Sequence, residues 1–178
     1  IFSTYGPDDV AQYLVDRYVV GPDSRTPPSM AVLRIAADQL RMVNGAPAPD
    51  IDLVAPEGLD TTRLADLLPQ HAFTVLFFYS STCDHCHAQI PGLRQLVADV
   101  DPKKLQVVGI ALDADLQEFR TSMVVQGINW PCFSELNGWG AKAAKAYNVK
   151  ATPTLIVLDR QSKIRAKPTD HLELKAFL

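Results

Sequence analysis

The sequence predicts an α/β fold, a central sheet flanked by helices, with a helical extension at the N-terminus. From Thr62 onward, short apolar runs typical of buried strands alternate with segments in which apolar residues recur at helical spacing. The run from Phe73 to Tyr79 is almost wholly apolar, as expected of a central strand covered on both faces. With 178 residues, 47% of them hydrophobic, the chain can bury one full core and an appended subdomain.

Residues 1–44 are expected to form the helical extension. Apolar residues recur at helical spacing over residues 8–20, which predicts a first helix there. A second helix is predicted over residues 28–43, because Pro28 is well placed to open it. The stretch "GPDSRTPP" between the two helices is punctuated by glycine and proline and fits a turn.

The main domain is expected to span residues 45–178. It opens with segment 44–58, in which proline and glycine are too frequent for a helix and indicate a linker that runs into an edge strand. The alternation of strands and helices that follows predicts a mainly parallel sheet. The predicted elements are the strands 73–79, 105–112, 154–159 and 164–166 and the helices 86–100, 116–125, 140–147 and 170–178.

Charge and hydropathy exclude several classes of partner. The formal net charge is −3, and no run of five or six like charges or basic stripe with interleaved aromatics is present, so nucleic acid is not an expected partner. No apolar run reaches the roughly 18 residues that a membrane helix needs. We therefore expect contact with a membrane only through an anchor outside this chain. The sequence begins at Ile1 rather than methionine, so any signal peptide or lipid anchor would lie outside it.

The stretch "STCDHCHAQIPG" contains the residues most suggestive of chemistry. Cys83 and Cys86 form a C-x-x-C pair at the predicted junction of a buried strand and a helix, where ligands collect in open α/β sheets. The free N–H groups and partial positive charge of a helix N-terminus stabilise a thiolate and lower the pKa of a cysteine there. Cys83 is therefore the expected nucleophile. Cys86, one turn further in, is expected to resolve the mixed disulfide that Cys83 forms with a substrate.

The same letters allow other interpretations. Cys83, Cys86 and His87 match the C-x-x-C-H motif that attaches c-type haem, and a Cys/His cluster can hold zinc or copper. Against haem, no axial methionine stands in a Pro/Gly-rich loop. Against zinc, the chain has one further cysteine, Cys132, in the apolar stretch "WPCF". A purely structural disulfide is a further alternative.

Other conspicuous side chains are expected to be structural. Cys132 is interpreted as a small buried hydrophobe. Trp130 and Trp139 are expected to pack in the core or at its rim, and His71 and His171 are expected at the surface near helix ends.

The order strand, C-x-x-C, helix and then "KATPTLIV" resembles the thioredoxin fold, and most closely its TlpA/ResA-type branch of bacterial extracytoplasmic thiol-disulfide oxidoreductases. The resemblance runs from about Pro47 to the end of the chain. Pro91 corresponds to the proline that kinks the cysteine helix, Pro153 to the cis-proline, and residues 113–136 to the insertion of this branch. The resemblance implies a central mixed sheet flanked by helices.

The resemblance also implies an activity and its partners. It implies an enzyme that reduces or exchanges protein disulfides in the periplasm or cell envelope, served by an upstream electron donor and needing no metal or cofactor. Pro153 would present Thr152 beside Cys83, where a backbone edge could bind an extended substrate by strand addition. Three alternatives to this activity stay open. They are a net disulfide oxidase or isomerase, a metal- or haem-carrying module, and a redox-inert interaction domain resting on the extension.

Several positions depart from the pattern of this branch. Thr82 stands where the branch usually has tryptophan, Gln89 where it has glutamate, and Phe77 where thioredoxin has a buried aspartate. A peroxidase of the peroxiredoxin type would carry proline and threonine where Leu76 and Ser80 stand, which disfavours that activity.

Four polar residues are expected to tune the cysteine pair: Asp84, His85, His87 and Gln89. With no carboxylate at the family positions, His85, His87 or water must accept the proton of the resolving thiol. His85 resembles the more oxidising members, in which a histidine favours the thiolate and so the reduced form, whereas the charge of Asp84 opposes that trend. The direction of electron flow therefore stays open.

Overall fold

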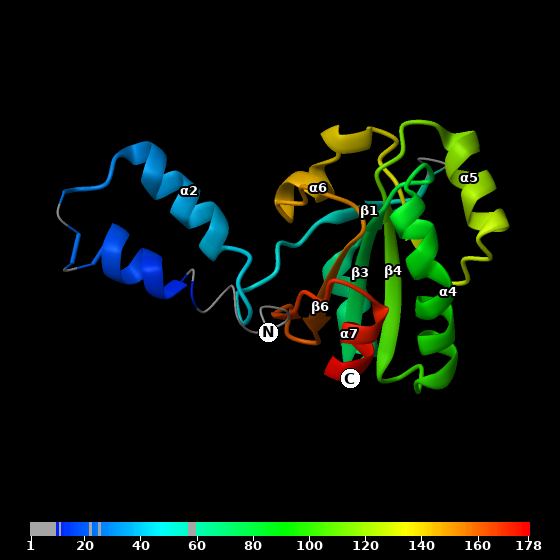
Figure 1. Cartoon of the computed structure of the whole chain (residues 1–178). Helices are drawn as coiled ribbons and strands as arrows, with labels where there is room; N and C mark the ends of the chain where they lie inside the picture. The colour runs from blue at the N-terminus through cyan, green and yellow to red at the C-terminus, as the bar shows by residue number, and fades with distance from the viewer. Residues whose placement is uncertain (1–9, 11, 22, 25, 57–59) are drawn as a thin grey trace.

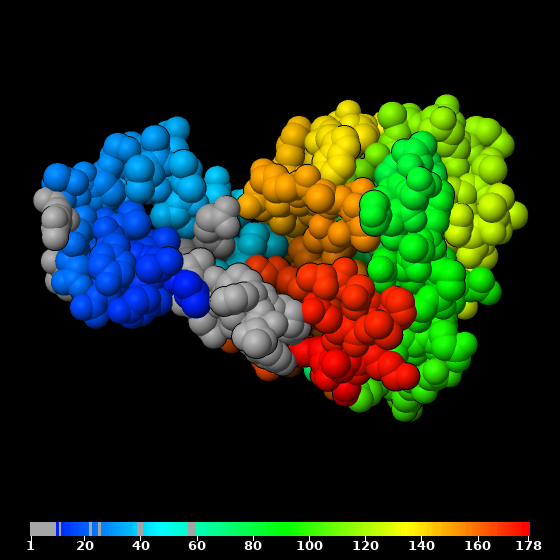
Figure 2. Space-filling view, viewed as in Figure 1, coloured from blue at the N-terminus to red at the C-terminus, as the bar shows by residue number. Residues whose placement is uncertain are grey.

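A computed structural model describes residues 10, 12–21, 23–24, 26–56 and 60–178. Figure 1 shows a sheet with helices on both faces, and two helical segments that stand to one side of it. Figure 2 shows the same arrangement as a compact body from which the extension projects.

The described part of residues 1–44 contains two helices, whose boundaries differ from the predicted ones. In the first helix, residues 10 and 12–14 are α-helical and Val15–Val19 (η1) form a π-helix, while residues 8, 9 and 11 lie outside the described part. The second helix, α2, spans Met30–Leu40 and so ends before the predicted Val43. Beyond the helix, Gly45 has a φ of +88°, which favours glycine, and it donates its N–H to the Ile164 carbonyl at 2.6 Å.

The segment that links the extension to the main sheet is more ordered than a plain linker. Ala46 accepts a backbone hydrogen bond from Ile164, and Ala48 donates one to Ser162. The strand expected after it exists as β1 (Asp52–Val54), but β1 pairs with β2 (Thr61–Arg63) in a separate two-stranded sheet. The linker therefore does run into an edge strand, as predicted, and that strand belongs to the small sheet.

The main sheet has five strands in the order β5-β4-β3-β6-β7. These are β3 (Phe73–Tyr79), β4 (Leu105–Ala111), β5 (Cys132–Phe133), β6 (Thr154–Asp159) and β7 (Ile164–Ala166). The pairings β3·β4 and β4·β5 are parallel, whereas β3·β6 and β6·β7 are antiparallel. The mixed sheet of the thioredoxin fold is confirmed, and the mainly parallel sheet inferred from element order alone was wrong.

The point at which one connection re-enters the sheet accounts for this error. Between β5 and β6 the chain forms a short 3₁₀ turn, η3 (Gly138–Gly140), and the five-residue helix α6 (Lys142–Ala146). Thr154, the first residue of β6, pairs with Phe78 near the carboxyl end of β3. The connection therefore does not return to the amino end of the sheet, so β6 enters at the carboxyl end and runs antiparallel.

Helices cover both faces of the sheet. One face is covered by α4 (Asp84–Asp99), α5 (Leu116–Val125) and α7 (His171–Phe177), and the other by β1, α3 (Leu64–Leu67), η2 (Leu68–Gln70) and α6. Side chains of β3 alternate between these two cores: Phe77 packs with Ile90 and Leu174, and Phe78 with Tyr147. The prediction that β3 is covered on both faces is confirmed.

Candidate active site

The cysteine pair lies where β3 ends and α4 begins. Cys83 is the N-cap of α4 and Cys86 lies in its first turn; the two form a disulfide with a Cα–Cα distance of 5.2 Å, within the usual range. The backbone N–H of Cys86 donates to Sγ of Cys83 at 3.2 Å. The Cys83 sulfur therefore accepts a hydrogen bond from a helix N–H group and lies at the positive end of the helix dipole.

The two sulfurs differ in access. Cys83 is half-buried, whereas Cys86 is fully buried among the apolar side chains beneath α4, which include Ile90 and Leu93. Only the first cysteine is therefore open to a reaction partner in this state.

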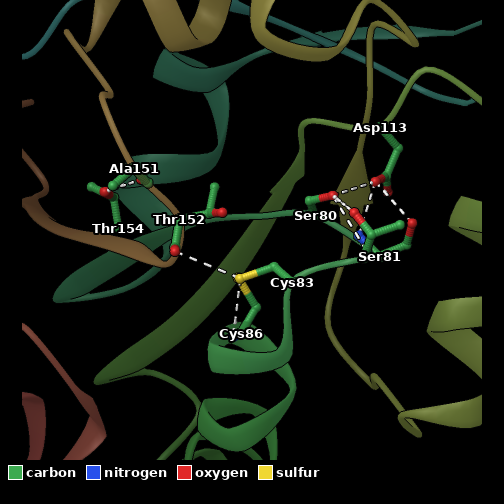
Figure 3. Close-up of a disulfide and its surroundings, with 9 residues drawn as sticks. Ser80, Ser81, Cys83, Cys86, Asp113, Ala151, Thr152 and Thr154 are labelled. Carbon is green, nitrogen blue, oxygen red and sulfur yellow. Dashed lines mark hydrogen bonds between the residues drawn. A yellow bond between two sulfur atoms is a disulfide. The ribbon is translucent and has the colours of Figure 1, made fainter.

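The loop into β6 meets the cysteine pair from the other side. The Thr152–Pro153 peptide bond is cis, and the Thr152 carbonyl oxygen lies 3.6 Å from Sγ of Cys83. Figure 3 shows this carbonyl directed at the disulfide, and the Thr154 hydroxyl donating to the Ala151 carbonyl at 2.7 Å within the same loop. The structure thus brings together two segments that are about seventy residues apart in sequence.

Asp113, a buried carboxylate, holds the segment that precedes Cys83. Its Oδ1 accepts hydrogen bonds from the Ser80 hydroxyl at 3.0 Å and from the N–H and hydroxyl of Ser81 at 2.8 and 2.9 Å (Figure 3). No motif or spacing in the sequence marks this residue. It follows the buried strand next to β3, so the rule that chemistry gathers at the carboxyl ends of neighbouring strands could have identified it.

The four predicted tuning residues have different surroundings. Asp84 and His85 are exposed in the first turn of α4. His87 is half-buried, and its Nε2 is shielded with no hydrogen-bond partner among the described residues. Gln89 Oε1 accepts from the backbone N–H of His171 at 3.0 Å and lies 2.8 Å from its Nδ1, so in this disulfide state it ties α4 to α7.

The two histidines expected at the surface are only half-exposed. The ring of His171 packs over Gly92, where any Cβ would overlap the imidazole. His71 follows η2, and its Nδ1 lies 2.6 Å from the Pro102 carbonyl oxygen. Both do lie at helix ends, and each makes a specific contact with another segment.

Cys132 packs on the sheet away from the motif. It is a half-buried free thiol in β5, and burial raises its pKa to about 11 against weaker opposing hydrogen bonds from Tyr79 and Gly109. A Cβ at Gly109 would overlap its sulfur, so the fit is tight. Trp130 is buried beside it, as expected, whereas Trp139 is 54% exposed.

Two features of the described residues bear on the other interpretations. No group of three or more His, Cys, Asp or Glu side chains in that part of the chain is arranged to hold a metal ion. Within the same residues, every helix is too short or too polar to cross a bilayer.

A cysteine pair that forms a disulfide at the head of a helix, within this five-stranded mixed sheet, defines a redox protein of the thioredoxin fold. Residues 44–167 match the AhpC/TSA family, and the chain belongs to that family. The prediction of a redox enzyme is confirmed at this level.

Solved structures agree with the fold. The C-terminal domain of a putative thiol-disulfide oxidoreductase from Bacteroides thetaiotaomicron is 22% identical, with a TM-score of 0.69 over 76% of this chain and 93% of that one. A domain of a possible thiol-disulfide isomerase from Cytophaga hutchinsonii ATCC 33406 is 26% identical, with a TM-score of 0.66 over 76% and 90%.

One curated protein is also similar. "Mercury resistance operon ORF3" from Streptomyces lividans is 29% identical over 114 residues, which are 63% of this chain. The match spans only 59% of the length of that protein.

Proposed function

We propose that this enzyme reduces or exchanges disulfides in protein substrates, with Cys83 as the attacking thiolate and Cys86 as the resolving thiol. The observation that supports this most is the difference in access: a half-buried sulfur at the helix N-terminus lies directly above a fully buried one.

The reaction starts from the dithiol form. The Cys83 thiolate attacks one sulfur of the substrate disulfide, that S–S bond breaks, and the leaving sulfur departs as a thiolate that takes up a proton. Cys86 then loses its proton and attacks Sγ of Cys83, which releases the second substrate thiolate. Two electrons pass to the substrate, and the enzyme is left with the intramolecular disulfide. An upstream dithiol donor returns the pair to the reduced form.

Local geometry favours this division of roles. The Cys86 N–H and the positive end of α4 stabilise negative charge on Cys83. Burial disfavours charge on Cys86, which therefore stays a thiol until the mixed disulfide makes the neighbouring Sγ of Cys83 electrophilic. Position 77 is phenylalanine and Gln89 binds His171, so we propose that His85, His87 or water accepts the proton of Cys86.

Substrate docking is proposed at Thr152 and Pro153. The Thr152 carbonyl beside the disulfide supports it, because a backbone group at that place can pair with an extended substrate segment next to its reacting cysteine. Asp84, His85, His87 and Gln89 are proposed to set the reduction potential. An extracytoplasmic, bacterial location and the division into an extension (1–44) and a main domain (45–178) belong to the same proposal.

A turnover assay tests the proposal. With dithiothreitol as donor and a disulfide-bonded protein as acceptor, wild type and the control Cys132→Ser should turn over alike, and Cys83→Ser should be inactive. Turnover by Cys83→Ser would refute the assignment. The same reduced enzyme is mixed with hydrogen peroxide, and faster oxidation by peroxide than by the protein disulfide would favour a peroxidase instead.

A further inference from the structure

A pocket of about 380 Å³ lies between the start of α4 and the helix α5, beside the cysteine pair. Figures 1 and 2 show these two helices next to each other on one face of the molecule. Ser81, Thr82 and His87 line the side that bears the motif. Thr82 is bonded directly to Cys83, so the pocket begins one residue from the attacking sulfur.

Two shielded polar atoms belong to residues of this pocket. Ser122, on α5, is only 8% exposed, and its hydroxyl has no hydrogen-bond partner among the described residues. Nε2 of His87, on α4, is likewise shielded and without a partner in that part of the chain. Buried polar atoms are nearly always hydrogen-bonded in folded proteins, so a hydroxyl and a ring nitrogen without a protein partner favour a polar occupant of this pocket over a purely apolar one.

The charges of the lining residues restrict what that ligand can be. Asp115 and Glu118 contribute carboxylates, and His87 is the one lining side chain able to carry a positive charge. Val125 adds an apolar surface on the same wall. A long aliphatic stem that ends in a cationic hydrogen-bond donor, as in lysine or arginine, matches both features.

The walls of the pocket are held at both ends. At one end the Asp113 carboxylate binds the N–H and hydroxyl of Ser81. At the other, the Arg94 guanidinium on α4 donates to the Gln126 carbonyl at the end of α5, at 3.5 Å. Because the pocket is already formed, ligand binding loses less conformational entropy than it would if the walls had to be ordered first.

We propose that this pocket binds a lysine or arginine side chain of the protein substrate, close to the cysteine under attack. Figure 3 shows Cys83 between Thr152 on one side and Ser81 with Asp113 on the other. A substrate segment that pairs with Thr152 and crosses Cys83 therefore reaches the pocket next. This inference rests on the proposed function and adds a specificity to it.

Disulfide-bonded peptide pairs test the pocket. One lysine, norleucine or glutamate is placed at each of the three positions on either side of the reacting cysteine, and kcat/KM is measured for each peptide. At one position, lysine should exceed glutamate by about tenfold, with norleucine between them. Glu118→Gln, which removes one charge from an exposed side chain, should reduce that preference severalfold. Asp66→Asn removes an equal charge from α3, on the opposite face of the sheet, and should leave the preference unchanged.

The outcomes separate the two proposals. If wild type reduces all peptides equally, the pocket proposal is overturned while the activity stands. An unchanged preference in Glu118→Gln would also overturn the pocket proposal. An equal loss of preference in Asp66→Asn would do the same, because the electrostatic field of the whole protein would then explain the result. If kcat/KM for cystamine falls severalfold in Glu118→Gln and the peptides show no preference for lysine, the occupant is a small cationic disulfide. The proposal of a protein side chain is then refuted. Failure of wild type to reduce any peptide would instead refute the proposed function.

Discussion

Replacement of Asp113 by alanine should both destabilise the protein and slow its redox reaction. Its Oδ1 accepts three hydrogen bonds from Ser80 and Ser81, at 2.8 to 3.0 Å. A hydrogen bond to a charged group contributes about 1.5–3 kcal/mol to stability. The two hydroxyls can rotate toward water after the substitution, but the N–H of Ser81 loses its acceptor.

We therefore expect Asp113→Ala to lower the free energy of unfolding by about 2–4 kcal/mol. For a protein of this size that corresponds to a fall in Tm of roughly 5–15 °C. Asp113→Asn keeps an oxygen acceptor and should lose about half as much. Because the serine segment leads directly to Cys83, disulfide exchange should slow in the alanine variant even at temperatures where it is fully folded.

Urea unfolding of the oxidised protein measures the loss, and stopped-flow reaction of the reduced protein with a disulfide measures the rate. The exposed carboxylate of Asp66, replaced by asparagine, is the control and should change stability by less than about 0.5 kcal/mol. If Asp113→Ala is as stable as that control, the three hydrogen bonds do not hold the segment.

Three further predictions concern the cysteines and their neighbours. Burial raises the pKa of Cys132 to about 11, so this residue stays a thiol at neutral pH. In the reduced protein near pH 7, iodoacetamide should therefore label Cys83 about a thousandfold faster than Cys132. The rate of Cys132 labelling should rise with pH up to about 11. Equal labelling near neutral pH would contradict the assignment of the nucleophile. Gln89→Glu should add an ionisation to the pH–rate profile of disulfide exchange, whereas superimposable profiles would limit this position to holding α7. His85→Ala should lower the reduction potential by tens of millivolts and Asp84→Asn should raise it, as measured in dithiothreitol redox buffers; shifts of the opposite sign would refute these tuning roles.

Hydrophobic periodicity predicted the helices and strands whose formation depends on their own residues. The apolar run 73–79 has the length and composition of a strand covered on both faces. The helical spacing of apolar residues after Cys86 placed the cysteine pair at the junction of that strand and a helix. The direction of β6 could not be inferred from periodicity, because it depends on the end of the sheet at which the connection from β5 brings the chain back. The pairing of β1 with β2 depends likewise on contacts that no single segment encodes.

The sequence points to the two cysteines of the candidate site but not to the hydrogen bonds that hold the segments around them. Cys83 and Cys86 are recognisable because their spacing is itself a chemical signature. The bonds of Asp113 to Ser80 and Ser81, and of Gln89 to His171, join residues 32 to 82 positions apart. Such contacts are set by the packing of whole elements. The position after a buried strand could point to Asp113, but neither residue type nor spacing indicates which groups it binds.

The most direct test of the proposed roles is to trap the mixed disulfide. Reduced Cys86→Ser protein, which keeps the attacking thiol and lacks the resolving one, is mixed with a disulfide-bonded substrate and examined by intact-mass and peptide mass spectrometry. A stable covalent complex should form through Cys83, and none should form with Cys83→Ser. A complex linked through Cys132, or one that forms equally well in the Cys83→Ser variant, would contradict the assignment of Cys83 as the nucleophile.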